Sequence, residues 1–181
     1  MRWPILALGS VLAICPTLAL SANIADGARS VYLEDQAGNR VDIAEISVSN
    51  GVYEIEMKGE KFSDHFLSMR PFKCIDGAEK TWCHVPYPYA IARDISDELT
   101  DLEYDLLFLW KDKGEYGIDL WNGVYYQLEL SDDGRIRGHL HEMDMNILSA
   151  PPDAGNMRPI RDIDLEPGEA DSHWLPVVVI E

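Results

Sequence analysis

The strongest constraint on the fold is the alternation of apolar and polar residues in segments that reverse at turn sequences. The dipeptide Asn50-Gly51 is typical of a tight two-residue hairpin turn. Such a turn pairs Val48 with Tyr53, which places the apolar side chains of both strands on one face of a sheet. Between Ile43 and Ala44 the alternation slips by one residue, which predicts a β-bulge there.

A second hairpin is predicted over residues 124–141. A three-residue loop, Asp132-Asp133-Gly134, places Leu130 opposite Ile136 and separates the apolar side chains from the polar ones. A two-residue loop would mix the two faces. The sequence therefore predicts a type I turn with Gly134 in the left-handed conformation.

One short helix is expected over residues 96–103. Thr100 and Glu103 have the spacing of a capping box, although Asp94 or Ser96 could equally start the turn. No other segment of the chain after residue 22 has a clear helical pattern.

Strands dominate the rest of the chain. A strand is expected over residues 104–110, which are apolar on both faces from Leu106 to Trp110, as in a buried strand, and 116–121 form another candidate. Pro, Gly and acidic residues make 151–174 a long irregular acidic loop before a closing apolar strand at 175–180. We therefore expect a mainly β fold in a single domain over residues 23–181. It would be a small antiparallel barrel or sandwich of about eight strands with one short helix.

Residues 1–22 have the features of a cleaved signal peptide. Arg2 precedes an apolar run that ends at Leu20, and Ser21 and Ala22 are small residues suited to cleavage. The run is shorter than the ~20 residues of a spanning helix, and no later segment is apolar enough to span a membrane. Lipidation of Cys15 is the less favoured alternative, because the large Ile14 precedes it. The sequence thus predicts a periplasmic or secreted protein.

Two cysteines, Cys74 and Cys83, remain after cleavage. Both lie in extended segments separated by turn residues, so a hairpin would bring their sulfurs together. An even number of cysteines in an exported chain favours a disulfide. A redox-active or metal-binding pair is the alternative, but the spacing is not that of a CxxC motif.

Composition restricts the classes of partner. With 46% apolar residues the chain can form a core, and it is too apolar for a disordered protein. A formal net charge of −17 argues against nucleic-acid binding, which needs clustered Lys and Arg. The same charge would attract a cationic protein or polycation. No phosphate-binding glycine loop, GxSxG elbow or HExxH helix is present, so catalysis is not expected.

His139 and His141 form the one arrangement with a chemical rationale for a metal. Residues i and i+2 on a strand point the same way, so two imidazoles so placed can chelate zinc or copper. His173 is a candidate third ligand, and a metal-dependent hydrolase is the corresponding alternative function. The competing interpretation is that the pair lies on a solvated sheet face.

Aromatic residues suggest a further contact surface. Trp82, Tyr87, Tyr89 and Tyr125 are candidates for exposed rings that would stack on sugars or bind a cationic or proline-rich partner. Aromatic side chains in strands are more often part of the core.

The stretches 66–74, 82–89, 101–107 and 171–176 resemble those of uncharacterised exported bacterial proteins without an assigned activity. The resemblance implies export and supplies no mechanism. We therefore expect an exported binding or accessory module of the bacterial envelope. A metal-binding protein built on the two histidines, or a small-ligand carrier with a lipocalin-like barrel, are the alternatives.

Overall fold

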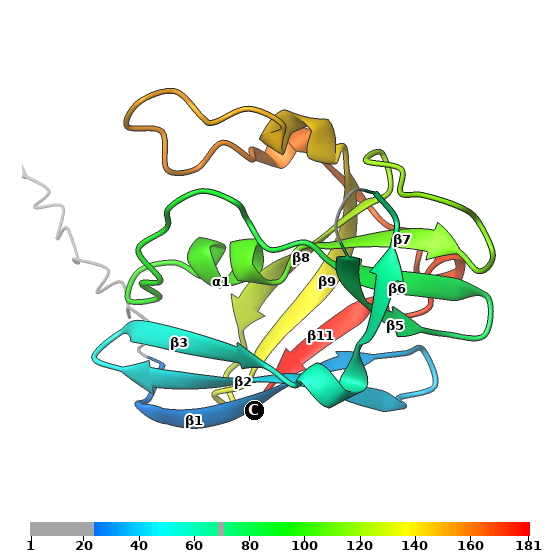
Figure 1. The fold of residues 1–181 in the computed structure, drawn as a ribbon. Helices are drawn as coiled ribbons and strands as arrows, with labels where there is room; N and C mark the ends of the chain where they lie inside the picture. The colour runs from blue at the N-terminus through cyan, green and yellow to red at the C-terminus, as the bar shows by residue number, and fades with distance from the viewer. Residues whose placement is uncertain (1–23, 69–70) are drawn as a thin grey trace, which may run out of the picture.

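A computed structural model describes residues 24–68 and 71–181 and shows one large antiparallel sheet with a single short α-helix (Figure 1). The predicted signal peptide, with Cys15, lies outside the described residues. The part of the chain that the structure describes contains no helix that is long and apolar enough to cross a membrane.

Eleven strands are found in the described ranges, paired in the order β3-β2-β1-β11-β9-β8-β7-β6-β5-β4, with β10 pairing on β9. Their bounds are β1 Gly27–Glu34, β2 Arg40–Ser49, β3 Val52–Met57, β4 Ser63–Phe66, β5 Pro71–Asp76, β6 Lys80–His84, β7 Phe108–Asp112, β8 Gly123–Leu130, β9 Ile136–Met143, β10 Leu165–Pro167 and β11 Val177–Ile180. The helix α1 is Thr100–Asp105, and four 3-10 turns are η1 Gly59–Lys61, η2 Met145–Leu148, η3 Asp162–Asp164 and η4 Ala170–Ser172.

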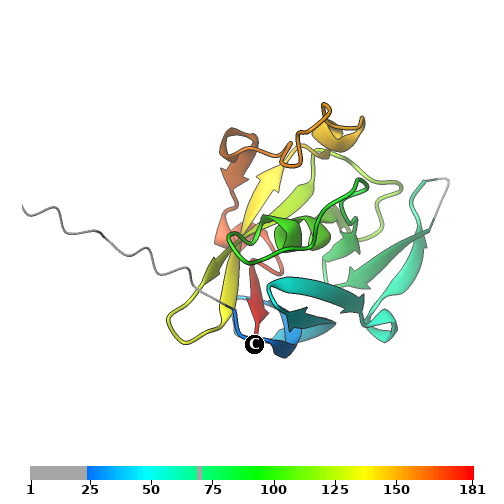
Figure 2. The ribbon, with the colours of Figure 1, turned by 90° about the vertical axis from the view of Figure 1, so that its left-hand side faces the viewer.

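The sheet is strongly curled but open. Its two edge strands, β3 and β4, are consecutive in the chain and are joined by residues 58–62 alone, so the sheet must bend back on itself (Figure 2). The two edges are not hydrogen-bonded to each other as neighbouring strands. The mainly β, antiparallel class is confirmed. The expectations of a closed barrel and of about eight strands are wrong.

Both predicted hairpin registers are confirmed. Val48 pairs with Tyr53, and Asn50 and Gly51 have φ of 51° and 79°, as a two-residue turn requires. Leu130 pairs with Ile136, and Gly134 is left-handed at φ 80°. The predicted bulge is also present. Val31 pairs with Ala44 and Tyr32 with Asp42, so Ile43 is the extra residue of β2.

Two apolar clusters form the core. The larger one occupies the inside of the curled sheet and includes Val31, Ile46, Tyr126, Leu140, Val178 and, from α1, Leu102. The second lies between the sheet and the segment that follows β9, and it includes Tyr104, Tyr125, Met143, Leu148 and Ile160. Because side chains fill the interior of an open sheet, the fold is not the lipocalin-like barrel of the carrier alternative.

Three predicted elements need correction. The helix begins at Thr100 and extends to Asp105, and the Thr100 side chain does not cap it. The strand expected over 104–110 therefore starts only at Phe108. Residues 116–121 form no strand, because Gly114 and Gly117 have φ of 92° and 83°, which interrupts an extended run.

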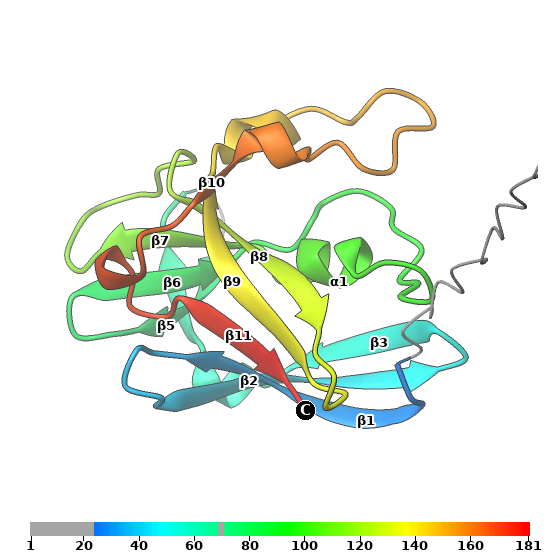
Figure 3. The same ribbon diagram turned by 180° about the vertical axis from the view of Figure 1, so that it is seen from behind.

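The C-terminal strand is central to the sheet. β11 lies between β1 and β9, with Pro176 just before its first residue (Figure 3). The acidic segment 151–174 is mostly irregular, as predicted, but it also contains η3, β10 and η4. Through β10 it is fastened to β9, where Leu165 pairs with Met143.

Candidate functional site

A cleft lies between α1, β8 and residues 158–165, and we call it the α1 cleft. Its cavity has a volume of about 600 Å³. The wall is rich in carboxylates, contributed by Asp97, Glu98, Glu103, Glu129 and Asp162. Two arginines, Arg158 and Arg161, also line it. A cavity with convergent polar groups is the default candidate for a binding site in a protein.

The helix beside this cleft buries three acidic side chains, Asp101, Glu103 and Asp105. The Asp105 carboxylate accepts hydrogen bonds from Arg93 Nε at 2.8 Å and from the Tyr53 hydroxyl at 2.9 Å. The Asp101 carboxylate is 2.5 Å from the Arg158 guanidinium. Each of these two buried charges therefore has a cation as partner, which is the usual requirement for burying a carboxylate.

Glu103 differs, because no cation forms an ion pair with it among the described residues. Its carboxylate accepts a hydrogen bond from the Tyr125 hydroxyl and another, 2.6 Å long, from the Leu128 main-chain N–H. Burial raises the pKa of Glu103 above its ordinary value, in spite of these two hydrogen bonds. Burial and the neighbouring Glu103 charge also raise the pKa of Tyr125. Glu103 and Tyr125 are therefore a hydrogen-bonded pair in the cleft wall whose pKa values are both raised by burial.

Arg158 fastens the outer wall of the cleft to α1. Its guanidinium binds the Glu98 carboxylate at 2.9 Å as well as Asp101, and it lies 6.0 Å from the centre of the Tyr104 ring. Nearby, the main-chain N–H of Ile160 donates to the Tyr104 hydroxyl at 3.1 Å. The wall is therefore held by charged and neutral contacts to the same helix.

The remaining charge of the cleft is negative. Arg158 is neutralised by Glu98 and Asp101, and Arg161 pairs with Asp164 at 2.8 Å. The carboxylates of Asp97, Glu129 and Asp162 are exposed and form no ion pair within the described part of the chain. The arrangement can thus accept a positively charged group.

Three of the four aromatic residues proposed as exposed contacts are buried. Trp82, Tyr87 and Tyr125 are 0%, 7% and 4% exposed, so this expectation is wrong for them. Tyr89 is half-buried, and its hydroxyl donates to the Leu148 carbonyl. Trp82 on β6 and Tyr125 on β8 are buried because both faces of the sheet are covered there, so alternation along a strand does not separate buried from exposed rings. Tyr87 lies outside the strands and packs in the second apolar cluster with Tyr104.

The three histidines proposed as metal ligands do not come together. His139 and His141 lie on one face of β9, opposite Gln127 and Tyr125. His173 is buried, and its Nε2 lies 2.6 Å from Glu142 Oε1. Glu142 comes directly after His141 on β9, so its side chain is on the opposite face of the sheet from the two other histidines. In residues 24–68 and 71–181 no group of three or more His, Cys, Asp or Glu side chains is placed to hold a metal ion. Zinc or copper binding by the histidine pair stays a prediction.

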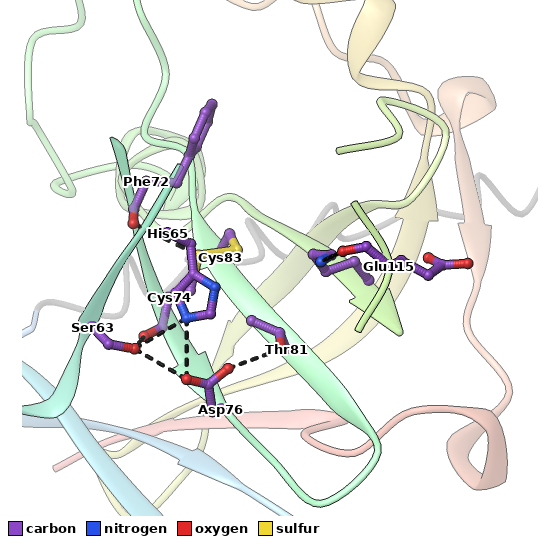
Figure 4. Close-up of a disulfide and its surroundings, with 9 residues drawn as sticks. Ser63, His65, Phe72, Cys74, Asp76, Thr81, Cys83 and Glu115 are labelled. Atoms are coloured by element: carbon purple, nitrogen blue, oxygen red, sulfur yellow. Dashed lines mark hydrogen bonds and ion pairs between the residues drawn. A yellow bond between two sulfur atoms is a disulfide. The ribbon is translucent and has the colours of Figure 1, made fainter. Parts of the chain in front are cut away.

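The structure places Cys74 and Cys83 as direct partners across β5 and β6, with 2.10 Å between the sulfurs (Figure 4). The predicted disulfide pair is therefore supported. Both side chains are completely buried. They link two adjacent strands and so have a structural role.

A polar group lies beside the disulfide, and Figure 4 shows Ser63, His65 and Thr81 around the Asp76 carboxylate. His65 Nε2 is 3.1 Å from both Ser63 Oγ and Asp76 Oδ2. In a serine hydrolase triad the serine and the carboxylate contact different ring nitrogens, so these residues do not form one. The group instead concentrates hydrogen bonds on Asp76.

The sequence interpretation missed both Glu103 and Arg158 as residues of the cleft. The available signal was the spacing of Asp101, Glu103 and Asp105, which alternate with apolar residues inside a helix. A six-residue helix that buries three carboxylates is stable only if other groups pair with them or donate hydrogen bonds to them. The partners themselves come from distant segments and could not be identified from spacing.

No known protein-family model, curated protein or solved structure matches the chain. The resemblance to exported bacterial proteins stays a prediction, and the candidate function depends on the geometry described above.

Proposed function

We propose that this chain is an exported, non-catalytic binding module that takes a cationic group of a partner into the α1 cleft. The observation that carries the proposal is a set of exposed carboxylates, Asp97, Glu129 and Asp162, around a cavity of about 600 Å³, which form no ion pair with any residue that the structure describes. A lysine or arginine side chain of a basic protein, or an amine of a polycation, has the charge and size to enter such a cleft.

The net charge of the chain supports the same partner class. A formal charge of −17 creates a long-range field that speeds the encounter with cations and weakens with added salt. The overall charge explains why cations are attracted to the protein, but not where on its surface they bind. The location comes from the cleft, where Arg158 and Arg161 are already neutralised by neighbouring carboxylates.

The test is calorimetric titration of the protein with tetralysine. We expect binding that weakens about tenfold or more when salt rises from about 50 mM to about 500 mM. A triple variant, Asp97→Asn with Glu129→Gln and Asp162→Asn, should bind about tenfold more weakly than the natural protein.

The matched control removes the same charge elsewhere. Glu45, Glu54 and Glu56 are exposed on β2 and β3 and do not line the cleft. Their triple change to Gln should reduce affinity by no more than about threefold, through the overall field alone. Equal losses in the two triple variants would show that the cleft has no special role, and the proposal would then be wrong.

A further inference from the structure

A second cavity contains a buried ammonium group that has no carboxylate partner. Lys111 on β7 is only 7% exposed. Its Nζ donates a hydrogen bond to the Glu115 carbonyl, and within the described ranges no Asp or Glu forms an ion pair with it. Since burying an unpaired charge is costly, such a residue is expected only where something else offsets the charge.

The cavity beside Lys111 has a volume of about 540 Å³. It is bounded by β4, β5, β6, β7 and the turn at 113–115, and its lining includes His65, Phe66, Leu67, Asp76 and Thr81. An ammonium has three N–H donors, and the Glu115 carbonyl takes one of them. Two donors therefore remain for a group that enters the cavity.

Asp76, a carboxylate that lines the same cavity, is already engaged. Its oxygens accept hydrogen bonds from Ser63 Oγ at 3.1 Å and from Thr81 Oγ1 at 2.9 Å, and His65 contacts it as well. Figure 4 shows this group on one side of the disulfide and Glu115 on the other. Asp76 thus stabilises the β4–β5–β6 end of the cavity through these contacts and forms no ion pair with Lys111.

We propose that this cavity binds a small organic carboxylate, whose charge pairs with the Lys111 ammonium. The apolar body of the ligand would lie against Phe66, which is 70% exposed, and Leu67. Lys113, at the rim, adds a second positive charge. A monoanion fits better than phosphate, because Asp64, Asp76 and Glu115 line the same cavity and repel a dianion more strongly than a monoanion.

This site is formed by other strands than those of the α1 cleft, and it is proposed to bind an anion and not a cation. Either proposal can therefore fail without the other. The probe for it is benzoate, with benzamide as its neutral counterpart and inorganic phosphate as the competing anion. We expect benzoate to raise the melting temperature of the protein and to shift NMR signals of residues 63–66 and 111–115. Benzamide and phosphate should do neither.

The decisive variant is Lys111→Met, which keeps most of the length of the side chain and removes its charge. It should bind benzoate at least about tenfold more weakly. It should also melt at a higher temperature than the natural protein without benzoate, because a buried charge without an ion-pair partner is gone. Lys61→Met is the control, because Lys61 is exposed and does not line the cavity, and it should retain benzoate affinity within about threefold.

The outcomes separate binding from a purely structural role. If Lys111 only holds the 113–115 turn through the Glu115 carbonyl, Lys111→Met melts at a lower temperature and the natural protein does not respond to benzoate. Either that pair of results, or benzoate shifts outside the cavity, overturns the proposal. Tighter binding of phosphate than of benzoate overturns the assignment to a carboxylate.

Discussion

The hydroxyl of Tyr125 on β8 donates a hydrogen bond to the buried carboxylate of Glu103 on α1. The same carboxylate accepts the main-chain N–H of Leu128 at 2.6 Å. One side chain therefore joins the helix to a central strand at two points, and it also lines the cleft.

Replacing Glu103 tests how this link contributes to stability. Glu103→Ala leaves the Tyr125 hydroxyl and the Leu128 N–H without an acceptor, and we expect a loss of about 2–3 kcal/mol in the free energy of unfolding. Glu103→Gln keeps the shape, and the Tyr125 hydroxyl can accept from the amide, so the loss should be about 1 kcal/mol or less. Urea denaturation followed by tryptophan fluorescence measures both values.

The same residue predicts a pH dependence with a defined sign. Burial raises the pKa of Glu103 above 4.5, so the folded protein holds this proton more tightly than the unfolded chain does. Its contribution to stability is complete below pH 4.5 and is lost as pH rises through the folded-state pKa. The natural protein should therefore gain stability relative to Glu103→Gln when pH is lowered from about 7 to about 5. A difference that stays constant or shrinks contradicts this assignment.

Two histidines, the half-buried His84 and the buried His173, predict the opposite effect of acid. Burial lowers the pKa of His84, which lies 5.2 Å from Phe108 between ring centres, and it also lowers the pKa of His173. Both groups favour the folded state above pH 6.5, and this contribution is lost as pH falls through their folded-state pKa values. NMR titration of the imidazole signals should give midpoints below 6.5 for both. A midpoint at or above 6.5 for either residue disproves the prediction for that residue.

The disulfide gives a fourth prediction. Cys74 and Cys83 are nine positions apart in the sequence, and closing a loop of this size stabilises a protein by about 2.5–3 kcal/mol in the chain-entropy estimate. Adding dithiothreitol should lower the free energy of unfolding by that amount. In the double variant Cys74→Ser with Cys83→Ser, the reductant should have no effect. Equal stability of the natural protein with and without reductant argues against a formed bond.

Gly138 tests the close contact between β9 and its neighbours. A methyl group at this position would lie 2.5 Å from Leu128 Cδ2 and 2.6 Å from Val178 Cγ1, so Gly138→Ala should cost about 1–3 kcal/mol. Gly59→Ala is the control, since a methyl group there meets nothing within 4 Å. It should change stability by no more than about 0.5 kcal/mol. Thermal unfolding of the two variants measures the contrast, and equal effects would mean that the packing around Gly138 is looser than described.

The sequence predicts both hairpins because their information is local. Asn50 and Gly134 tolerate positive φ, and the alternation of apolar residues on each side of these turns fits one register only. The disulfide follows from the same reasoning, because Cys74 and Cys83 belong to strands joined by a short turn.

The helix and the cleft depend on contacts that spacing does not reveal. Glu103 has the position of a capping residue, but its carboxylate is used by Tyr125 and Leu128, which are 22 and 25 residues away in the chain. The turn before the helix is held instead by Asp94, whose carboxylate accepts the Ser96 N–H at 2.8 Å. Partners so distant in the sequence are brought together only by the curl of the sheet.

Exposure was equally hard to predict. Trp82 alternates with Thr81 and Cys83 along β6, yet all three are buried. The strand is covered on both faces, by the main core on one side and by a smaller cluster around the disulfide on the other. A pattern of period two carries no information about exposure in such a strand.

The most direct measurement of the central claim is an NMR titration of the isotope-labelled protein with tetralysine. If the α1 cleft takes a cationic group, the signals that shift belong to residues 96–103, 127–130 and 158–162, and the shifts are lost in the variant with Asp97→Asn, Glu129→Gln and Asp162→Asn. Small shifts spread evenly over the acidic surface, unchanged in that variant, would contradict the account.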